Sequence, residues 1–422
     1  MRRWPALAIL AMLAATRVAH ADRGGDARAP DPAAPVPPSE VPTPPSEEPT
    51  DPSSEPTAPT APSSEPAAPS GEPTAPAAPS GEPTAPAADV ITLHPRRPPS
   101  TLRRIAAIGA AIFPGVFVRG AGSYVIGERR TAKRLLLVGA TGAAATAIGG
   151  GAVGASGAAS QLIWPGVPVL LLGFGVFMPT WLADIWVAAG GERVRGGPRG
   201  TPPWSLEVST TGLRDPYRAR ALAGAAVSVE LGRLGLGAST LLDAQGESRT
   251  ADVEARLRIR GAAATAGPIA EGSRLSLRAA ARYHRDDPDD ITLATAELEA
   301  VLRGELRHLD PRLAGMFLEL STGLGLERAT YANGTHDLDS LLLGGFAWGA
   351  YLGRCGEAML FYDHRRDHLA GGLYAWRGSS FVGSFGARAQ VVLTGPWALR
   401  AELEVGNAWV GTLGLRYQGG AR

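Results

Sequence analysis

The sequence predicts an all-β membrane protein: an antiparallel β-barrel of about twelve strands, preceded by an α-helical membrane hairpin and a disordered proline-rich segment. Apolar and charged side chains alternate residue by residue through the second half of the chain. A long stretch without charge precedes that half, and most of the 36 prolines precede that stretch. We therefore divide the chain into four segments, residues 1–21, 22–100, 101–191 and 203–418.

Residues 1–21 have the features of a cleaved export signal. Arg2 and Arg3 give a positive start, and residues 6–15 are apolar throughout. Small residues, Ala19 and Ala21, then occupy the −3 and −1 positions of a cleavage site. The apolar stretch is too short to span a bilayer. We expect an exported protein.

Residues 22–100 form the second segment, which is rich in Pro, Ala, Ser and Glu. Residues 70–79 make a unit that residues 80–87 repeat in part. Such a composition lacks the apolar bulk of a core, and each proline removes a backbone donor. This composition predicts that the segment is a disordered, extended spacer. The spacer would cross the periplasm or contact the cell wall or periplasmic proteins. A disordered tail without such a role is the alternative.

Residues 101–191 predict a helical membrane hairpin. No charged residue lies between Arg134 and Asp184, and this length accommodates two helices, at 135–155 and 162–188. A third, shorter element fits at 105–118. Basic residues flank both ends of the region: Arg129, Arg130, Lys133 and Arg134 before it, and Arg193, Arg195 and Arg199 after it. This pattern places both ends on one side of the membrane.

A short motif and an acidic residue stand out in the hairpin. Gly120-x-Gly122-x-Tyr124-x-x-Gly127 precedes the first long helix, and Asp184 lies within the second. Residues 120–188 thereby resemble a family of small two-helix membrane-hairpin domains. An intramembrane carboxylate costs roughly 2.5–3.5 kcal/mol, which makes Asp184 a functional candidate. The interpretation we favour places Asp184 at the helix end, in the headgroup region of the membrane.

The alternation with period two is the signature of the fourth segment. In residues 251–260, Val253 and Leu257 share one face of a strand, while Glu254 and Arg256 share the other. About twelve such runs follow one another. Residues 291–308 also suit a helix by propensity.

Two folds are compatible with this alternation. A soluble sandwich or barrel would bury the apolar face, whereas a transmembrane barrel would turn that face to lipid. Strands of ten or more residues and an apolar face rich in Ala, Gly and Leu favour the transmembrane barrel. Aromatic residues gather near the predicted strand ends, as interfacial girdles do: Trp204, Tyr283, Tyr331, Trp376, Trp397, Trp409 and Tyr417.

Residues 203–418 thus resemble bacterial outer-membrane β-barrels, and the resemblance implies an outer-membrane location. Members of that class usually end in an aromatic residue, whereas here Tyr417 lies five residues before Arg422. The lipid bilayer is then the expected partner. An inner-membrane protein with a periplasmic β-rich binding module is the alternative.

The charged face of the strands supplies the candidate site. If the barrel closes, the following residues face the lumen together: Glu254, Arg256, Arg258, Arg260, Arg278, Arg282, Glu297, Glu299, Arg303, Glu305, Arg307, Glu319, Arg388, Arg400, Glu402, Glu404 and Arg416. Mixed charges either brace a plugged lumen through ion pairs or line a narrow pore, in which arginine favours small anions. We expect a structural or narrow-pore role.

Composition and motifs argue against other functions. The chain holds 41 Lys and Arg against 40 Asp and Glu, so no nucleic-acid partner is expected. A single cysteine, Cys355, excludes an intramolecular disulfide framework. We expect no catalytic residue, no metal site and no cofactor. The second alternative is a barrel enzyme acting on membrane lipids through His364 or His368.

Overall fold

The computed structural model describes residues 99–156, 160–191, 197, 200–214, 218–261, 272–288, 290–353, 355–364, 383–406 and 408–420. The chain divides into two units, residues 1–90 and 91–422, and every helix and strand described below belongs to the second. The predicted export signal and the predicted spacer up to residue 98 lie outside the described residues. Both stay predictions.

The first half of this unit is helical, with two long helices. The helices are α2 (Thr101–Ile112), α3 (Ala121–Ile126), α4 (Arg129–Ala155) and α5 (Ser160–Ala189). The Ser100 side chain caps α2 by accepting a hydrogen bond from the Arg103 N–H. At 1.5 Å per residue, α4 and α5 are about 40 and 45 Å long. Both are long and apolar enough to cross a membrane.

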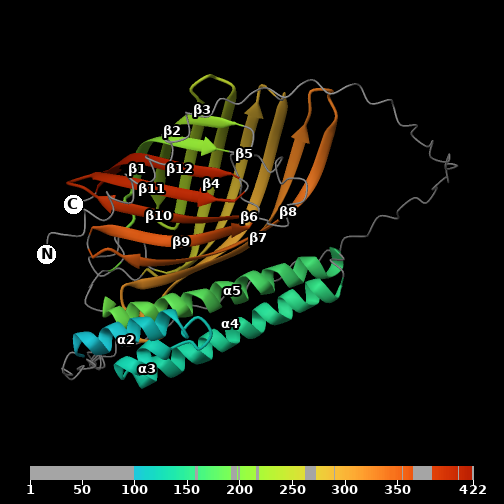
Figure 1. Cartoon of the computed structure of the whole chain (residues 1–422). Helices are drawn as coiled ribbons and strands as arrows, with labels where there is room; N and C mark the ends of the chain where they lie inside the picture. Colours follow the sequence, from blue (N-terminus) through green and yellow to red (C-terminus); the bar gives the residue numbers. More distant parts are fainter. Residues whose placement is uncertain are drawn as a thin grey trace, which may run out of the picture. The chain divides into compact units, whose positions relative to one another are not determined.

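Close contact between α4 and α5 depends on glycine. A Cβ at Gly142 of α4 would lie 2.7 Å from the Phe177 nitrogen and 2.9 Å from the Gly173 oxygen, both in the backbone of α5. Small residues at helix contacts let backbones approach closely, which is how helices associate in lipid. The two helices therefore run side by side (Figure 1).

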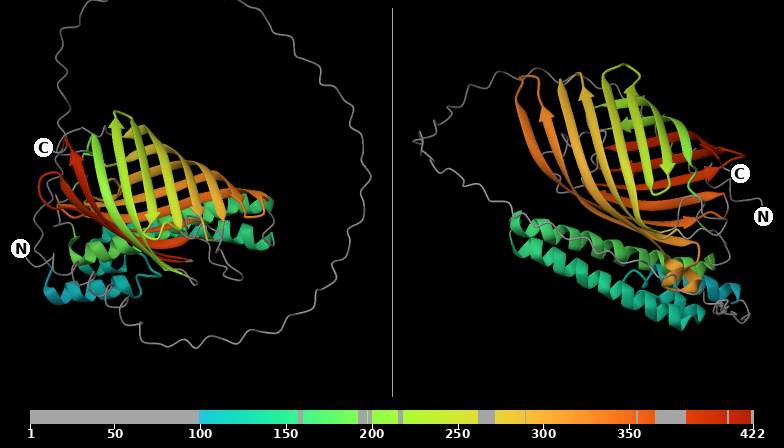
Figure 2. Two further views of the ribbon diagram at one scale, coloured as in Figure 1. Left: turned by 90° about the horizontal axis from the view of Figure 1, so that it is seen from above. Right: turned by 180° about the vertical axis from the view of Figure 1, so that it is seen from behind.

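The described residues of the second half form twelve antiparallel strands that close into a barrel (Figures 1 and 2). Each strand pairs with its neighbours in sequence, and β12 pairs with β1. The strands are β1 (Trp204–Arg214), β2 (Ala219–Leu231), β3 (Leu234–Asp243), β4 (Ser248–Gly261), β5 (Arg274–Asp286), β6 (Ile291–Glu305), β7 (Met316–Thr330), β8 (His336–Tyr351), β9 (Gly356–His364), β10 (Ser384–Val392), β11 (Trp397–Val405) and β12 (Trp409–Gly419).

The barrel has two ends with different chain connections. β1 begins and β12 ends at the same end, where Trp204 is paired with Gly419. The β2–β3, β4–β5, β6–β7, β8–β9 and β10–β11 connections lie there too, and we call this end the terminal mouth. The other connections form the far mouth, where Arg214 is paired with Trp409.

Apolar side chains cover the outside of the barrel and charged side chains occupy the inside. The neighbours Leu298 and Glu299 on β6 show the contrast, because Leu298 is 58% exposed and Glu299 only 2%. Exposed leucines and valines recur on the same outer face, among them Leu206, Val208, Val253, Leu257, Leu324, Leu326, Leu403 and Leu413. A water-soluble domain would bury this face. The predicted transmembrane barrel is confirmed, and the soluble β-rich module is excluded.

Three aromatic residues cluster on the outside at the terminal mouth. Tyr417 packs against Trp204 and Trp397, with ring centroids 5.5 and 5.1 Å apart. Tyr417 is opposite Leu206 in the register, so it faces outward. Amphipathic rings at this height suit a membrane–water interface. Trp376 lies outside the described residues.

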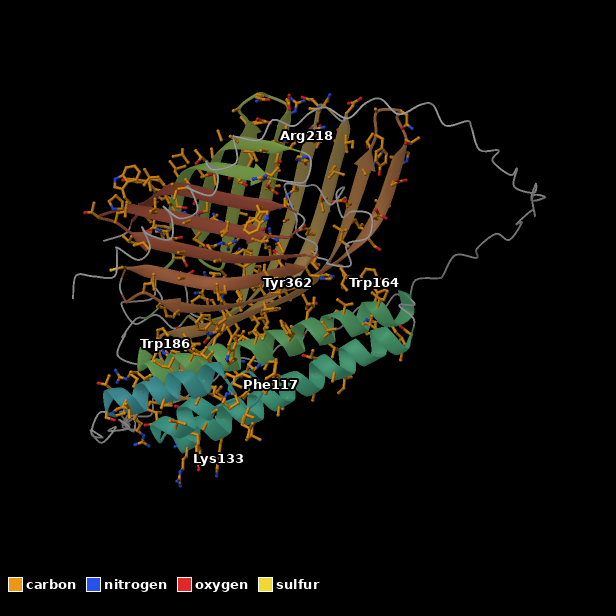
Figure 3. The ribbon with its side chains drawn as sticks, in the orientation of Figure 1. Phe117, Lys133, Trp164, Trp186, Arg218 and Tyr362 are labelled. Atoms are coloured by element: carbon orange, nitrogen blue, oxygen red, sulfur yellow. The ribbon has the colours of Figure 1, made fainter. Side chains whose placement is uncertain are left out.

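The helical hairpin packs on the outside of β7 and β8. Phe174 of α5 meets Phe346 of β8 edge to face, with centroids 5.6 Å apart. At the β6–β7 connection, Arg134 of α4 forms an ion pair with Asp310 at 3.1 Å. Since this connection belongs to the terminal mouth, the basic end of α4 lies there as well. Lys133 and Trp186 mark this end of the hairpin, and Trp164 marks the other (Figure 3).

We expect Gly142→Leu to destabilise the hairpin by about 1–3 kcal/mol, because the added side chain meets the backbone of α5. Gly151→Leu is the matched control, since nothing lies within 4 Å of a Cβ at that position. Denaturant unfolding in detergent micelles, followed by circular dichroism at the helical wavelength, measures both variants. Equal midpoints for the two variants would contradict the predicted helix contact.

Candidate functional site: the barrel interior

Ion pairs between neighbouring strands line the middle of the interior. Arg278 of β5 contacts Glu254 of β4 at 2.8 Å and Glu297 of β6 at 3.3 Å. Arg282, which lies four residues beyond Arg278 on β5 toward the far mouth, contacts Asp252 at 2.5 Å. Short charge-assisted hydrogen bonds, such as those of Arg278 with Glu254 and of Arg282 with Asp252, are the strong ones. Arginine therefore links three consecutive strands on their inner face.

Other ion pairs join strands that are not neighbours. Arg303 of β6 contacts Glu357 of β9 at 2.6 Å, although β7 and β8 lie between them in the wall. Arg220 of β2 contacts Asp286 of β5 at 2.9 Å in the same manner. Such pairs form only through the interior of the barrel. They link parts of the wall that are three strands apart.

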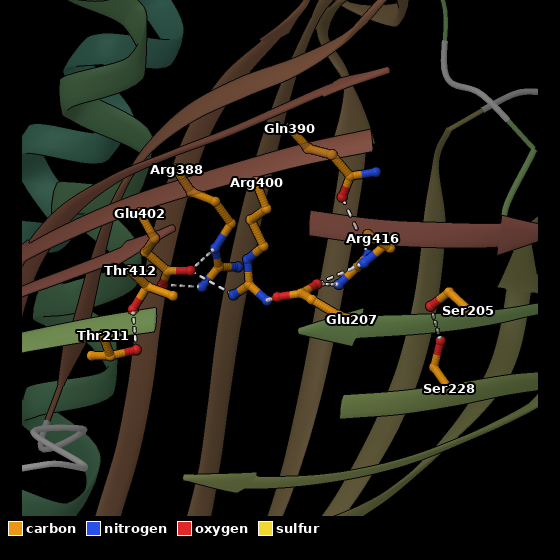
Figure 4. A network of polar contacts seen from close by, with 10 residues as sticks. All are labelled: Ser205, Glu207, Thr211, Ser228, Arg388, Gln390, Arg400, Glu402, Thr412 and Arg416. Atoms are coloured by element: carbon orange, nitrogen blue, oxygen red, sulfur yellow. Dashed lines mark hydrogen bonds and ion pairs between the residues drawn. The ribbon is translucent and has the colours of Figure 1, made fainter. Parts of the chain in front are cut away.

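A chain of alternating charges crosses β10, β11, β1 and β12 (Figure 4). Glu402 accepts hydrogen bonds from Arg388 at 2.6 Å and from Arg400 at 2.5 Å. Arg400 also contacts Glu207 at 3.3 Å, and Glu207 accepts a further bond from Arg416 at 2.7 Å. Each of the two carboxylates therefore forms ion pairs with two guanidinium groups.

Aromatic and apolar groups form part of the inner wall. The Arg303 guanidinium lies over the Phe317 ring, 3.6 Å from its centroid, and 5.6 Å from that of Tyr351. Leu341 and Leu343 of β8 are buried on the same face of the sheet as Tyr351. β8 is therefore apolar on both faces over this stretch: Leu341, Leu343 and Tyr351 are on the inner face, and α5 packs on the outer face.

Most of the charged residues predicted to face the lumen share the inner face in the register. These are Glu254, Arg256, Arg258, Arg278, Arg282, Glu297, Glu299, Arg303, Glu305, Glu319, Arg388, Arg400, Glu402, Glu404 and Arg416. The strands thus bring together residues up to 162 positions apart in the sequence, from Glu254 to Arg416.

Two predicted residues lie elsewhere. A β-bulge between Arg258 and Arg260 shifts the register by one, so Arg260 is opposite Leu275 and joins the outer face. Arg307 lies beyond the end of β6, in the 3₁₀ turn Leu306–His308, where it contacts Glu305 at 2.5 Å. The lumen-facing prediction is corrected for both.

The sequence analysis missed several partners of these charges. Glu207, Arg220, Asp252, Asp286 and Glu357 all take part in interior ion pairs. Glu207 stands between Leu206 and Val208, so the alternation of β1 carried the signal. Four of the five are acidic, which removes the excess of arginine that the predicted set had. The described interior does not favour anions through its net charge.

Asp184 is fully buried and binds the glycine motif. Its carboxylate accepts hydrogen bonds from the backbone N–H groups of Gly122 and Ser123, at 2.9 and 2.7 Å, and from the Ser123 hydroxyl at 2.6 Å. A Cβ at Gly122 would lie 2.6 Å from that of Ala111, so glycine is needed for this approach. The contact joins α3 to α5, and the headgroup location of Asp184 stays a prediction.

Of the two candidate histidines, His364 is among the described residues. His364 Nδ1 lies 3.0 Å from the Tyr362 hydroxyl. His368 lies outside the described residues. In the part of the chain that the structure describes, no group of three His, Cys, Asp or Glu residues is placed to hold a metal ion.

Comparisons with known proteins give matches only among solved structures. No protein-family model matches the chain, and no curated protein matches it. The KdgM porin in complex with disordered oligogalacturonate matches with a TM-score of 0.33 and 8% identity, over 51% of this chain and 98% of that chain. Omp33 of Acinetobacter baumannii matches with a TM-score of 0.28 and 9% identity, over 52% and 100%. The β domain of the Bordetella autotransporter BrkA matches with a TM-score of 0.29 and 14% identity, over 51% and 98%.

The class of the protein follows from the barrel's own geometry. A closed antiparallel barrel with an apolar outside and a charged inside is the architecture of outer-membrane barrels. The protein is an outer-membrane β-barrel.

Glu207→Gln is expected to destabilise the barrel by about 1–3 kcal/mol, because it removes the charged acceptor that Arg400 and Arg416 share. Glu247→Gln in the β3–β4 connection is the control, since Glu247 has no ion pair among the described residues. Urea unfolding in detergent micelles gives the free energy for both. A loss no greater in Glu207→Gln than in Glu247→Gln would show that the network contributes nothing.

Proposed function

We propose that the protein is a narrow pore for small hydrophilic solutes, whose width is set by ion pairs across its interior. The main observation in support is the 2.6 Å contact between Arg303 and Glu357, which connects β6 and β9 across the interior of the barrel. A bridge of this kind divides the cross-section without sealing it along its whole height.

Solvent access to the interior charges supports a passage over a solid plug. The side chains of Glu254 and Arg388 are each 37% exposed, although both face inward. An inward side chain in a closed barrel is exposed only to space within that barrel. Water next to these groups provides a path for small solutes.

The balance of charge supports weak selectivity. Acidic and basic side chains alternate through the network, and the acids at least match the arginines among the interior ion pairs. Rings of a single charge are what give a pore strong preference for one sign. We therefore propose that small cations and anions both pass.

The test is single-channel conductance of the full chain in planar bilayers. Glu357→Gln is expected to raise the conductance, because it releases Arg303 from the bridge. The double variant with Arg303→Gln is expected to add less than the sum of the single effects, since both act on one contact. Arg285→Gln is the control, because Arg285 pairs with Asp287 at the exposed end of β5.

Unchanged conductance in Glu357→Gln would show that the bridge does not limit passage. No conductance in any variant, with the barrel shown to be folded, would leave a structural role in place of a pore.

A further inference from the structure

A cavity of about 70 Å³ opens at the terminal mouth, and neither Arg303 nor Glu357 belongs to its lining. Its lining includes Glu230, Arg233, Arg256, Arg258, Arg274 and Ser276. Four guanidinium groups thus surround one small space together with a single carboxylate. This concentration of positive charge is absent from the mixed network in the middle of the barrel.

The one carboxylate in the lining does not balance these arginines. Glu230 pairs with Arg258 at 3.5 Å. Arg256 reaches Glu254 only at 3.7 Å, and its buried Nε has no hydrogen-bond partner. The positive charges of Arg233 and Arg274 are left without a carboxylate partner in the lining.

Arg274 is the least compensated of the four. It stands directly opposite Arg303 in the β5–β6 register, and like charges at that position repel each other. Arg303 is paired with Glu357 at 2.6 Å, whereas Arg274 forms no ion pair with the described acidic side chains. Arg233 stands in the short β2–β3 connection and is exposed.

We propose that this cavity is a binding site for a small oxyanion, a phosphate, sulfate or carboxylate group carried by a solute. Guanidinium groups bind such anions through paired N–H donors, and several of them around one cavity supply more donors than the protein itself uses. Thr201 also lines the cavity and adds a hydroxyl group. The site does not depend on conduction, because a closed barrel would hold the anion equally well.

Inorganic phosphate is the probe, added to the full chain in detergent micelles in a chloride buffer and followed by titration calorimetry. We expect saturable binding of one phosphate per chain. Removing two charged donors in the double variant Arg256→Gln, Arg274→Gln is expected to weaken binding about ten-fold or more. Arg416→Gln is the matched control, because it removes an interior arginine that lies outside the cavity.

Glu230→Gln gives a test of opposite sign. It removes the only carboxylate of the lining, so phosphate is expected to bind more tightly than to the unchanged protein. Heat-modifiable migration on gels shows that each variant is folded. Binding that falls equally in Arg416→Gln and in the double variant would overturn the site, as would the absence of saturable binding to the folded unchanged chain. Both results are read without a conductance measurement and are therefore separate from the test of the pore.

Discussion

Hydrocarbon offers no partner for a backbone N–H or C=O group, and the whole molecule is organised by that constraint. A sheet satisfies it only when no edge is left, which the pairing of β1 with β12 achieves from Trp204–Gly419 to Arg214–Trp409. Closure then separates two environments. In the described strands, outward side chains face the membrane or the helical hairpin, and inward side chains face the shared interior.

The interior follows from closure. Once twelve strands surround a common space, charges from distant parts of the chain meet across it, as Arg303 and Glu357 do. Their desolvation is offset by contacts on several sides, since Glu207 and Glu402 each serve two arginines. The same ion pairs that brace the wall narrow the space. One set of contacts therefore underlies both the bracing of the wall and the narrow bore that we propose.

The helical hairpin meets the same constraint in a different way. Its buried carboxylate, Asp184, accepts hydrogen bonds from two backbone N–H groups and a hydroxyl group, and these offset part of the cost of burying its charge. On the barrel side, α5 replaces lipid over β7 and β8. The sequence of β8 from 341 to 351 lacks the alternation that marks the other strands because its inner face, with Leu341 and Leu343, is apolar as well.

Local patterns in the sequence were sufficient to predict the barrel, its strands and its inner face. Alternation is a property of single strands, and it identifies Glu254 or Arg400 without any partner. Residues 291–308, which also suited a helix, are mostly strand β6, because tertiary pairing with β5 and β7 overrides propensity.

What the sequence did not reveal depends on three-dimensional register. The bulge that turns Arg260 outward involves two strands and has no signature in one of them. The partners of Arg303 and Arg220 are fixed only once the barrel closes. Asp184 was visible as an acidic residue in an apolar helix, but its contact with Gly122 and Ser123 spans about sixty residues.

Neighbouring alanines on β5 offer the most direct measurement of the central claim. Ala279 is opposite Leu298 on the outer face, and Ala280 is opposite Glu297 on the inner face. Each is replaced by cysteine in a Cys355→Ser background and carries a fluorophore in liposomes that contain a lipid-bound quencher. Strong quenching at position 279 and little at position 280 is the predicted result. Equal quenching at both positions, or stronger quenching at 280, would contradict a barrel with its apolar face in the membrane.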